Sequence, residues 1–560
     1  MRINDDSGPE QTAIQELDDG STSLSGKLVY LPNDVFLLVI SYLSPEDSIV
    51  CRGVNRAWLK TFSSEDVSWN LLRWHFPRCR EMRAPSAAAA ASSPKRPDWT
   101  ALYARVARRY HFLRAARPRL VEKVDVVQEA KQDHPLLFRG VEPWRRFLRF
   151  NDNTASFAYR DAAWSMDDGL LVYQDAEGRC VAYDLETRHR FAVPFGVAGK
   201  IVRRIRLRCG VLVVEWCERE AYHQLNDRES VHRHFATAFD VLRCSPRSSS
   251  RSPRFSVVRS VSGASGWTIT FRSEWKIHFL GLPLNRHDRF FSAHTATHYA
   301  LYLWQPNRSP WGEEDPLEQL TVWDISFPSQ YRPSQDPSGA HKPDADLGPH
   351  VIQRLTWRDL DFLGLRQRHT PSFREILLDD QNVYIHEEEH RWLAGPQSSL
   401  IPPRHHHVRC TGIPMTGMGP RWYDECCADG NVHLSFCPRS GSAARLNNAT
   451  STSTSHSNVW PGLAPCWRHE EFPYLTMSEL VDAEAGVRIV ARQCFMVEAL
   501  SVFVLPRISI KEEDGDGHET DEVRFGDEMW GELVGKGRIC GDERFVVGED
   551  MEGKVTVIWF

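Results

Sequence analysis

Residues that could bind a metal gather in two places in the second half of the chain. The first is the run His405–His407 with Cys410, and the second is Cys426–Cys427 with Cys437. Neither contains the repeated Cys-x-x-Cys pair of a structural zinc site, and the histidine run follows two prolines, which favours a loop. We therefore expect structural or incidental roles for these side chains, and no metal or other cofactor.

Carboxylates suited to acid–base chemistry stand together at Glu387–Glu389, between His386 and His390. A run of this kind after a strand most often forms a solvated sheet edge. The sequence also lacks a phosphate-binding glycine loop, a GxSxG elbow and an HExxH helix. Catalysis therefore has no candidate residues, and we expect a protein that is not an enzyme.

An arginine row, Arg204, Arg206 and Arg208, alternates with Ile205 and Leu207. In a strand this alternation places the arginines on one face and the apolar pair on the other. The arginine face could bind phosphate or carboxylate groups, but any half-buried strand with one solvated face shows the same pattern. We expect the solvated strand.

Residues 28–76 must fold as short amphipathic helices. Pro32 suits a first helical position, and apolar residues then recur at helical spacing on one face: Val35, Leu38, Val39 and Tyr42. A second helix begins at Ser44–Asp47, with an N-cap serine, a proline and two acids. Three such helices cannot shield this many large apolar side chains from water, so part of their surface needs a partner.

The same segment resembles an F-box. The resemblance rests on residues at the spacing of that family: Leu31, Pro32, Asp34, Val35, Ile40, Leu43, Asp47, Val54, Arg56 and Trp58, followed by Trp69, Leu72 and Phe76. It implies that the helices bind a Skp-type adaptor and attach the chain to a cullin ubiquitin ligase. The segment departs from the family at Ser48, where leucine is usual, and at Gly53, which we expect inside a helix at a cost near 1 kcal/mol.

The resemblance implies a set of adaptor-binding residues: Leu31, Pro32, Val35, Ile40, Leu43, Val54 and Trp58. Some of them must instead form the small internal core, and sequence alone does not divide the two groups. After the box, Asp98 and the stripe from Trp99 to Tyr110 predict a connecting helix with Arg105, Arg108, Arg109 and Arg114 on its solvated side. A similar helix follows the box in fungal-type F-box proteins.

Length and charge limit the remaining possibilities. The chain has 560 residues, enough for a small module and a large core, and its net charge of −6 argues against general attraction to nucleic acid. Cysteines lack regular spacing, and we find neither a leader nor an apolar run long enough to cross a membrane. We therefore expect a soluble protein of the cytoplasm or nucleus, with no membrane or nucleic-acid partner.

Beyond residue 140 the hydrophobic period changes from helical to alternating. Strands flank the turns Asp175–Gly178 and Asp550–Gly553, and a third hairpin is expected at Asp429–Phe436. Aromatic-Asp pairs at expected strand ends resemble degenerate WD repeats: Tyr183-Asp184, Phe239-Asp240 and Trp323-Asp324. Many short strands with excess tryptophan favour a β-propeller of six to eight blades, with a second β-domain such as a sandwich as the alternative.

The expected fold class is thus multidomain, α followed by all-β. The expected parts are a disordered tail (1–26), a three-helix F-box domain (27–80), a low-complexity linker (81–97), a connecting helix and linker (98–139), and a β-propeller-like domain (140–560) with disordered insertions near 244–254, 328–350, 443–458 and 511–522. The strand at 555–560 should pair with an early strand and close the propeller.

The function that follows is a non-catalytic substrate adaptor of an SCF-type ubiquitin ligase, which leads its target to proteasomal degradation. The F-box would dock a Skp-type adaptor with its cullin, and the β-domain would hold a protein target of unknown identity. Two alternatives stay open. The chain could be an F-box scaffold or regulatory protein acting outside a ligase, or its β-domain could contain an enzyme without a recognisable motif.

Overall fold

The structure is a computed structural model, and the chain forms two compact units. The helical unit contains residues 1–77 and 95–107, and the β-unit contains residues 78–94 and 108–560. The structure describes residues 28–83, 98–127, 163–224, 230–243, 266–277, 289–305, 315–368, 373–392, 404–416, 422–426, 436–437, 464–465, 476–482, 485–493, 498–504, 521–526, 528–533, 539–550 and 552–560.

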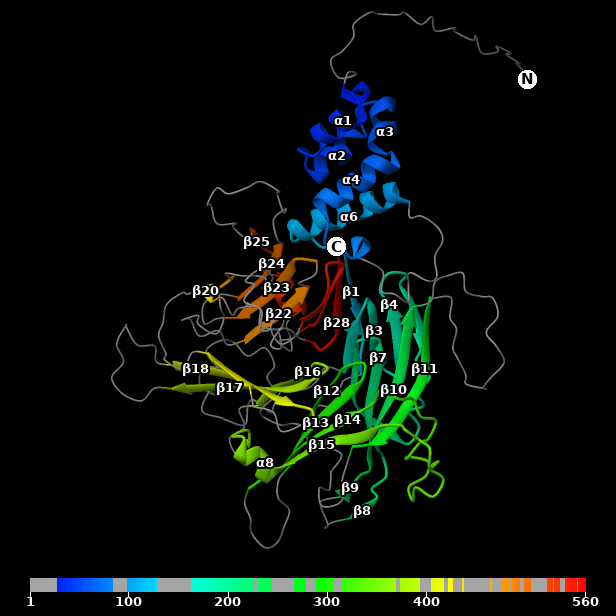
Figure 1. The fold of residues 1–560 in the computed structure, drawn as a ribbon, viewed down its shortest axis with the longest axis vertical. Helices are drawn as coiled ribbons and strands as arrows, with labels where there is room; N and C mark the ends of the chain where they lie inside the picture. The colour runs from blue at the N-terminus through cyan, green and yellow to red at the C-terminus, as the bar shows by residue number, and fades with distance from the viewer. Residues whose placement is uncertain are drawn as a thin grey trace, which may run out of the picture. The chain divides into compact units, whose positions relative to one another are not determined.

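The helical unit has four α-helices in the F-box segment, where we expected three, and a short 3₁₀-helix before them. A 3₁₀-helix, η2 (Leu28–Tyr30), precedes α1 (Asn33–Ile40), α2 (Pro45–Cys51), α3 (Arg56–Phe62) and α4 (Glu65–His75). The prediction for Gly53 was wrong, because α2 ends at Cys51 and the glycine lies in the turn before α3, so the expected helical cost does not arise. Figure 1 shows these helices in blue.

Side-chain caps explain where three of these helices begin. Ser44 accepts a hydrogen bond from the Asp47 N–H at 3.1 Å, which confirms the predicted start of α2. Asn55 caps α3 in the same way, and Ser64 caps α4. A cap satisfies an N–H group that has no partner inside the helix, and it is typically worth about 1 kcal/mol.

Helix α6 (Trp99–Arg114) confirms the predicted connecting helix. The carboxylate of Asp98 accepts from the Ala101 N–H at 3.0 Å, and most of the apolar stripe is buried: Leu102, Tyr103, Val106 and Tyr110. Arg105, Arg108 and Arg114 are exposed as expected. The prediction for Arg109 was wrong, because this side chain is 5% exposed and lies in a buried ion-pair network of the β-unit. The short 3₁₀-helix η3 (Arg80–Met82) precedes α6 in the chain.

The β-unit is built from four-stranded antiparallel sheets, six of them in the described residues. Each is named here by its first strand. Consecutive strands form four of them, and the first three are the β2 sheet with β2 (Trp164–Asp167), β3 (Leu170–Gln174), β4 (Cys180–Asp184) and β5 (His189–Ala192); the β12 sheet with β12 (Arg289–His294), β13 (His298–Gln305), β14 (Leu317–Asp324) and β15 (His350–Thr356); and the β16 sheet with β16 (Phe373–Leu378), β17 (Asn382–Trp392), β18 (Arg404–Pro414) and β19 (Trp422–Cys426).

The β22 sheet is also formed by consecutive strands, whereas the β6 sheet contains an inserted hairpin. The β6 sheet has β6 (Lys200–Arg208), β7 (Val211–Glu218), β10 (His234–Arg243) and β11 (Trp267–Lys276), with the hairpin β8 (His223–Gln224) and β9 (Ser230–Val231) between its middle strands; the β22 sheet has β22 (Thr476–Asp482), β23 (Val487–Gln493), β24 (Glu498–Val504) and β25 (Asp521–Arg524). Strands β20 (Phe436–Cys437) and β21 (Ala464–Pro465) form a pair, and α8 (Trp357–Phe362) and α10 (Glu528–Leu533) follow β15 and β25.

The sixth sheet joins the two ends of the β-unit. Strands β26 (Ile539–Gly541), β27 (Phe545–Glu549) and β28 (Val555–Trp559) are completed by β1 (Leu120–Val124), which pairs antiparallel with β28. Figure 1 shows β1 beside β28, although they lie far apart in the sequence. The expected pairing of the last strand with an early one is confirmed. The first strand of the β-unit begins at Leu120, inside the segment predicted as linker, rather than after residue 140.

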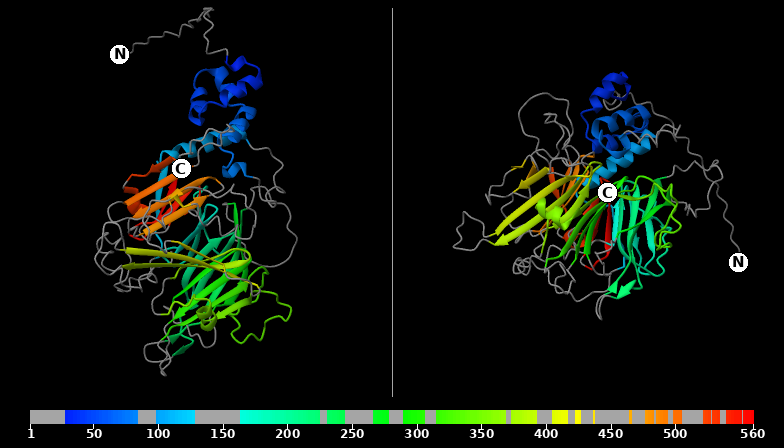
Figure 2. Two further views of the ribbon diagram at one scale, coloured as in Figure 1. Left: turned by 60° about the vertical axis from the view of Figure 1, so that its left-hand side comes forward. Right: turned by 60° about the horizontal axis from the view of Figure 1, so that its bottom comes forward.

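Apolar clusters lie between sheets that follow one another in the chain. Separate clusters fill the space between the β2 and β6 sheets, between the β6 and β12 sheets, and between the β12 and β16 sheets. Another cluster lies between the β2 sheet and the sheet formed by β1 and β26–β28, which we call the β26 sheet. The first strands of the sheets also contact one another, at β2 with β6, β12 with β16, β22 with β26 and β26 with β2. Figure 2 shows these sheets from two further directions.

Two hairpin turns confirm the Asp-x-x-Gly prediction. The carboxylate of Asp175 accepts from the N–H groups of Glu177 and Arg179, and Asp550 does the same for Glu552 and Lys554. The glycine of each turn has a positive φ, 79° at Gly178 and 88° at Gly553, which a residue without Cβ adopts at little cost. The third expected hairpin, at 429–436, lies almost entirely outside the described residues.

The aromatic-Asp pairs occupy one place in three sheets. Tyr183-Asp184, Phe239-Asp240 and Trp323-Asp324 lie on the third strand of the β2, β6 and β12 sheets. Two pairs end their strands as predicted, but β10 continues past Asp240 to Arg243. Asp184 and Asp324 each accept from a backbone N–H two residues later, so the carboxylate orders the turn that follows.

Several loop predictions were wrong or stay untested. Residues 328–350, predicted as a disordered insertion, form a hydrogen-bonded loop in which Ser329 donates to Asp346 and Tyr331 donates to the Asp336 carbonyl. The insertions near 244–254, 443–458 and 511–522 lie outside the described residues, except for Asp521–Glu522 at the start of β25. Among the helices that are described, none is both long and apolar enough to cross a membrane.

Candidate functional site

Exposed apolar side chains concentrate on the helical unit. Of the 17 large apolar residues that are exposed in the described part of the chain, nine lie between residues 30 and 59: Tyr30, Leu31, Val35, Leu38, Val39, Tyr42, Val50, Val54 and Leu59. We call these nine residues the apolar surface. Single exposed apolar residues are ordinary, but nine within thirty positions are an unusual concentration for one small unit.

The packing of α1 decides which of its residues face outward. Phe36 and Ile40 are buried, and the Phe36 ring meets Phe62 of α3 edge to face, with centroids 5.5 Å apart. The opposite side of α1 therefore carries Val35, 41% exposed, and Leu38, 62% exposed. The apolar stripe predicted from the sequence, which includes Val35 and Leu38, thus lies on the outer side of α1. A second apolar stripe, Phe36 and Ile40, forms the core.

The seven predicted adaptor-binding residues divide between surface and core. Those on the surface are Leu31, Pro32, Val35 and Val54, and those half-buried are Leu43 and Trp58. Ile40 is fully buried, so it belongs to the internal core and cannot contact a partner directly. The sequence did not single out Val50, at 72% exposed, or Leu59, at 50%, although both are part of the apolar surface.

The departure from the F-box pattern at Ser48 has a structural reason. Ser48 is buried, its hydroxyl donates to the Pro45 carbonyl at 2.7 Å, and it shares a short hydrogen bond with the Tyr103 hydroxyl of α6. A leucine here would leave the buried Tyr103 hydroxyl with a weaker set of partners. Ser48 and Tyr103 therefore join α2 to α6 within the helical unit.

The residues with metal-binding or acid–base character are described only in part, since Cys427 lies outside the described residues. The prediction of a loop at His405–His407 was wrong, since these residues lie within β18, and the glutamates at 387–389 lie within β17 rather than after it. Glu387 is 7% exposed and accepts from Arg409 at 2.6 Å and from Gln367 at 2.8 Å, so it is a structural carboxylate rather than a solvated edge. Among described residues, no three histidine, cysteine or carboxylate side chains are placed to hold a metal ion.

The arginine row also differs from its prediction. Arg204 is 8% exposed, and it donates to Glu215 at 3.2 Å, to Ser292 at 3.0 Å and to the Phe290 carbonyl at 2.7 Å. Burial lowers the pKa of Arg204 to about 10, which still leaves it charged at neutral pH. Arg204 thus joins the β6 sheet to the β12 sheet instead of facing solvent, whereas Arg208 is exposed as expected.

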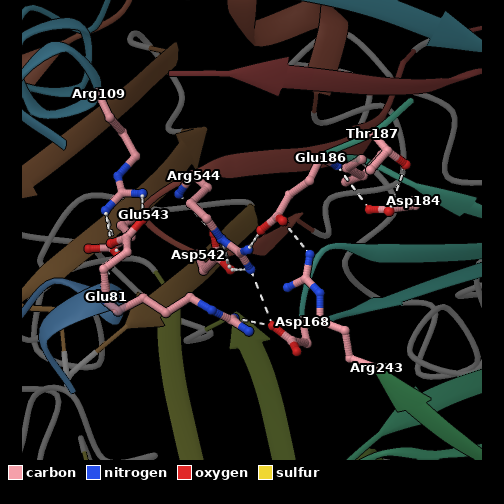
Figure 3. A network of polar contacts seen from close by, with 12 residues as sticks. Glu81, Arg109, Asp168, Asp184, Glu186, Thr187, Arg243, Asp542, Glu543 and Arg544 are labelled. Atoms are coloured by element: carbon pink, nitrogen blue, oxygen red, sulfur yellow. Dashed lines mark hydrogen bonds and ion pairs between the residues drawn. The ribbon is translucent and has the colours of Figure 1, made fainter. Parts of the chain in front are cut away.

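A buried network of charges lies beside the sheet that β1 completes (Figure 3). Glu543, whose side chain is 1% exposed, accepts from Arg109 at 2.9 Å, from the Tyr110 hydroxyl at 2.5 Å and from the Arg80 N–H at 2.8 Å. Arg109 also makes a two-bond pair with Glu81. Burial raises the pKa of Glu543 above its ordinary value. Glu543, in the turn after β26, therefore binds two segments that precede β1 in the chain, one at Arg80 and one at Arg109.

Arg544 is the second centre of this network, as Figure 3 shows. Its guanidinium donates to Asp542 at 2.6 Å and to Asp168 at 3.3 Å, and it also pairs with Glu186. Asp168 and Glu186 lie in turns of the β2 sheet, and Glu186 further pairs with Arg243 at the end of β10. Arg544 therefore connects the sheet completed by β1 to the first sheet of consecutive strands.

A cavity of about 260 Å³ lies beside these ion pairs, lined in part by Arg80, Arg83, Asp167 and Asp542. Arg80 pairs with Asp168, and Asp542 pairs with Arg544, so much of the charge on its walls is already neutralised.

Replacing Arg544 by methionine should destabilise the β-unit by about 3–5 kcal/mol at pH 7, because the change leaves buried carboxylates without their partner. Burial alone would raise the pKa of Asp542, but the Arg544 guanidinium lowers it below its ordinary value. Its contribution to stability is therefore present at neutral pH and is lost as the pH falls through that lowered value. The loss in Arg544→Met should accordingly shrink as the pH falls below 3.8, toward about pH 3.

Denaturant unfolding of the parent and Arg544→Met proteins at both pH values measures this difference. Adding Asp542→Asn to Arg544→Met should restore part of the stability, since it removes one of the unpaired charges. Equal unfolding midpoints for the parent and Arg544→Met at pH 7 would contradict the role given to this network.

Comparisons with known proteins give little further guidance. No family model matches the sequence, and no curated protein matches it. Among solved structures, the tricorn protease has a TM-score of 0.25 and 8% identity over 61% of this chain and 25% of that chain. The N-terminal domain of Nup159 has a TM-score of 0.24 and 10% identity over 71% and 76%, and an S. cerevisiae complex of Dbp5 with Nup159 and Gle1 has 0.23 and 8% over 71% and 89%. Similarity at this level assigns neither fold nor function to the chain.

Proposed function

We propose that this protein is an F-box substrate receptor of an SCF-type ubiquitin ligase. The observation that carries the proposal is the apolar surface: motif residues Leu31, Val35 and Val54 are exposed on a small unit whose own core is already complete. A Skp-type adaptor that covered these side chains would gain roughly 1.5–3 kcal/mol for each large one fully buried. Burial of this kind is sufficient for a stable interface.

We also infer that the β-unit is a β-propeller. The support comes from its repeated four-stranded antiparallel sheets, from the contacts between their first strands, and from apolar clusters that lie between successive sheets. Contacts between first strands are what a ring of blades with those strands at its centre would produce. Pairing of β1 with β28 then completes one blade from both ends of the β-unit, which closes a ring without a free edge there.

In this proposal the protein contributes position rather than catalysis. An associated conjugating enzyme transfers ubiquitin, and the receptor raises the effective concentration of the target lysines near that enzyme. The target would bind on loops at a face of the propeller, because the strands are occupied by packing between blades. No nucleic acid, membrane or cofactor is needed, and the proposed place of action is the cytoplasm or nucleus.

Affinity purification of the full chain tests the proposal against its alternatives. Recovery of both the adaptor and a cullin is the expected result. Adaptor without cullin would favour the scaffold function, and recovery of neither would contradict the F-box assignment. Chemical turnover by the purified protein alone would favour an enzyme in the β-unit.

A further inference from the structure

Lysine is scarce in this chain. Of its 68 basic residues, 11 are lysines and 57 are arginines. Lysine is ordinarily among the commonest residues of globular proteins, and the two side chains supply the same charge to a surface. They differ in chemistry, because ubiquitin is attached to the lysine amine, whereas the arginine guanidinium stays protonated and is not an acceptor.

The scarcity is greatest in the β-unit. Between Lys131 and Lys511 the sequence contains three lysines: Lys200, Lys276 and Lys342. A ligase receptor holds its target within reach of the conjugating enzyme, so lysines on the receptor compete with those of the target for ubiquitin. A surface whose positive charge comes from arginine avoids this competition while remaining soluble.

Carboxylates lie close to both described lysines near the sheet formed by β1 and β26–β28. Lys123 Nζ lies 2.7 Å from Glu532 and 3.2 Å from Asp550, and these partners raise the pKa of Lys123, chiefly through the hydrogen bond with Glu532. Lys554 Nζ lies 3.5 Å from Glu552 and 3.9 Å from Asp125. The Lys123 amine, which its carboxylate partners keep protonated, is a poor nucleophile, because attack requires the unprotonated lone pair.

Two further lysines are engaged in other ways. Lys200 is half-buried, with its Nζ 4.2 Å from the ring centroid of Trp216 and 4.5 Å from that of Phe195. Burial lowers the pKa of Lys200, but the two rings restrict the approach of a large reagent to its amine. Lys276 Nζ donates to the Pro337 carbonyl at 3.3 Å.

Lys342 differs from all four. It is exposed, in the loop that follows β14, next to His341, whose side chain is 87% exposed. Its backbone N–H donates to the Gly339 carbonyl. Among the described lysines of the β-unit, Lys342 is the one whose ammonium shows no hydrogen bond, ion pair or aromatic contact. The same loop is held by the Ser329–Asp346 hydrogen bond, so Lys342 is displayed on an ordered segment.

We propose that Lys342 is the principal self-ubiquitination site of the described β-unit, and that arginine elsewhere keeps this unit unmodified while a bound target is modified. In the reaction, the unprotonated Lys342 Nζ attacks the carbonyl carbon of the ubiquitin thioester carried by a conjugating enzyme. A carbon–nitrogen bond forms, the carbon–sulfur bond breaks, the enzyme's thiolate leaves, and the amine proton passes to solvent. This inference rests on the proposed function.

The test uses the full chain reconstituted with adaptor, cullin complex, activating and conjugating enzymes, ubiquitin and ATP. Five lysines outside the described residues are first changed to arginine, so that they do not compete: Lys27, Lys95, Lys131, Lys511 and Lys536. Mass spectrometry of ubiquitin remnants then maps the acceptors. Lys342 should carry most β-unit conjugates, and Lys342→Arg should remove them. Conjugation mainly at Lys123, Lys200, Lys276 or Lys554 would overturn the proposal.

A gain of lysine provides the matched control. Arg219 and Arg358 are exposed in the β-unit, and Arg219→Lys and Arg358→Lys keep the charge of the surface. In the Lys342→Arg background these changes should create conjugates at positions 219 and 358, and an assembled ligase that leaves both unmodified would also overturn the proposal. Co-elution of adaptor and cullin is measured first, because their absence would overturn the proposed function as well, whereas misplaced conjugates on an assembled ligase overturn this inference alone.

Discussion

The double variant Val35→Asp, Leu38→Asp is expected to lose adaptor binding by at least about 100-fold while the protein keeps its melting temperature. Both side chains face outward from α1, at 41% and 62% exposed, so aspartate does not disturb the core beneath. In the complex the change removes two apolar contacts, each worth roughly 1.5–3 kcal/mol, and it would also bury two charges. A loss of about 3–6 kcal/mol corresponds to a factor of 10² to 10⁴ in the dissociation constant.

The chain offers a matched control for this variant. Val351 and Leu242 are 37% and 62% exposed on the β-unit, so Val351→Asp, Leu242→Asp makes the same chemical change at the same exposure away from the apolar surface. Titration of purified adaptor into both proteins, with thermal unfolding alongside, separates binding from folding. Undiminished adaptor binding by the Val35, Leu38 variant, or an equal loss in the control, would contradict the assignment of the interface.

Truncation after Gly553 should leave the β-unit unable to fold. The deleted segment carries five buried apolar side chains: Val555, Val557, Ile558, Trp559 and Phe560. Their burial contributes roughly 7–15 kcal/mol, about the entire stability of a typical domain. The deletion also leaves β1 and β27 without a partner, and unpaired strands of this kind promote aggregation. We expect insoluble protein on expression.

A point change makes the same test less drastic. Val557→Asp places a charge at a fully buried position of β28, whereas Val121→Asp places it on β1 at a residue that is 39% exposed. Calorimetry should show loss of the cooperative transition in the first protein and a nearly unchanged transition in the second. A soluble, cooperatively melting truncated protein would mean that the β-unit is open or organised in another way.

The elements that local chemistry determines could be predicted from sequence. Ser44 starts α2, Asp98 starts α6, and the turns at Asp175 and Asp550 are ordered by hydrogen bonds that span only two to four residues. Each of these signals lies within the segment that it shapes. The same holds for the apolar alternation of the strands that flank those two turns.

The features that failed depend on distant partners. Arg109 looked solvated because its partner Glu543 lies 434 positions away, and Arg204 looked like a half-exposed strand residue because Ser292 and Phe290 come from another sheet. On α1 both sides are apolar, so hydrophobicity alone could not show that Phe36 and Ile40 face inward. The sequence therefore predicted that apolar side chains stay exposed on these helices, but which residues these are required the packing, and the need for a partner stays a prediction.

The pairing of β1 with β28 determines when their shared sheet can form during synthesis of the chain. Val124 of β1 pairs with Val555 of β28, 431 positions later. At roughly 5–20 residues per second, a ribosome needs about 20–90 s to pass from one to the other. During that interval the nascent helical unit, whose described residues end at 107, already has all its own helices, while β1 still waits for its partner. Under the proposed function, an adaptor would therefore be able to bind the apolar surface of a chain that is still being translated, before β1 has paired with β28.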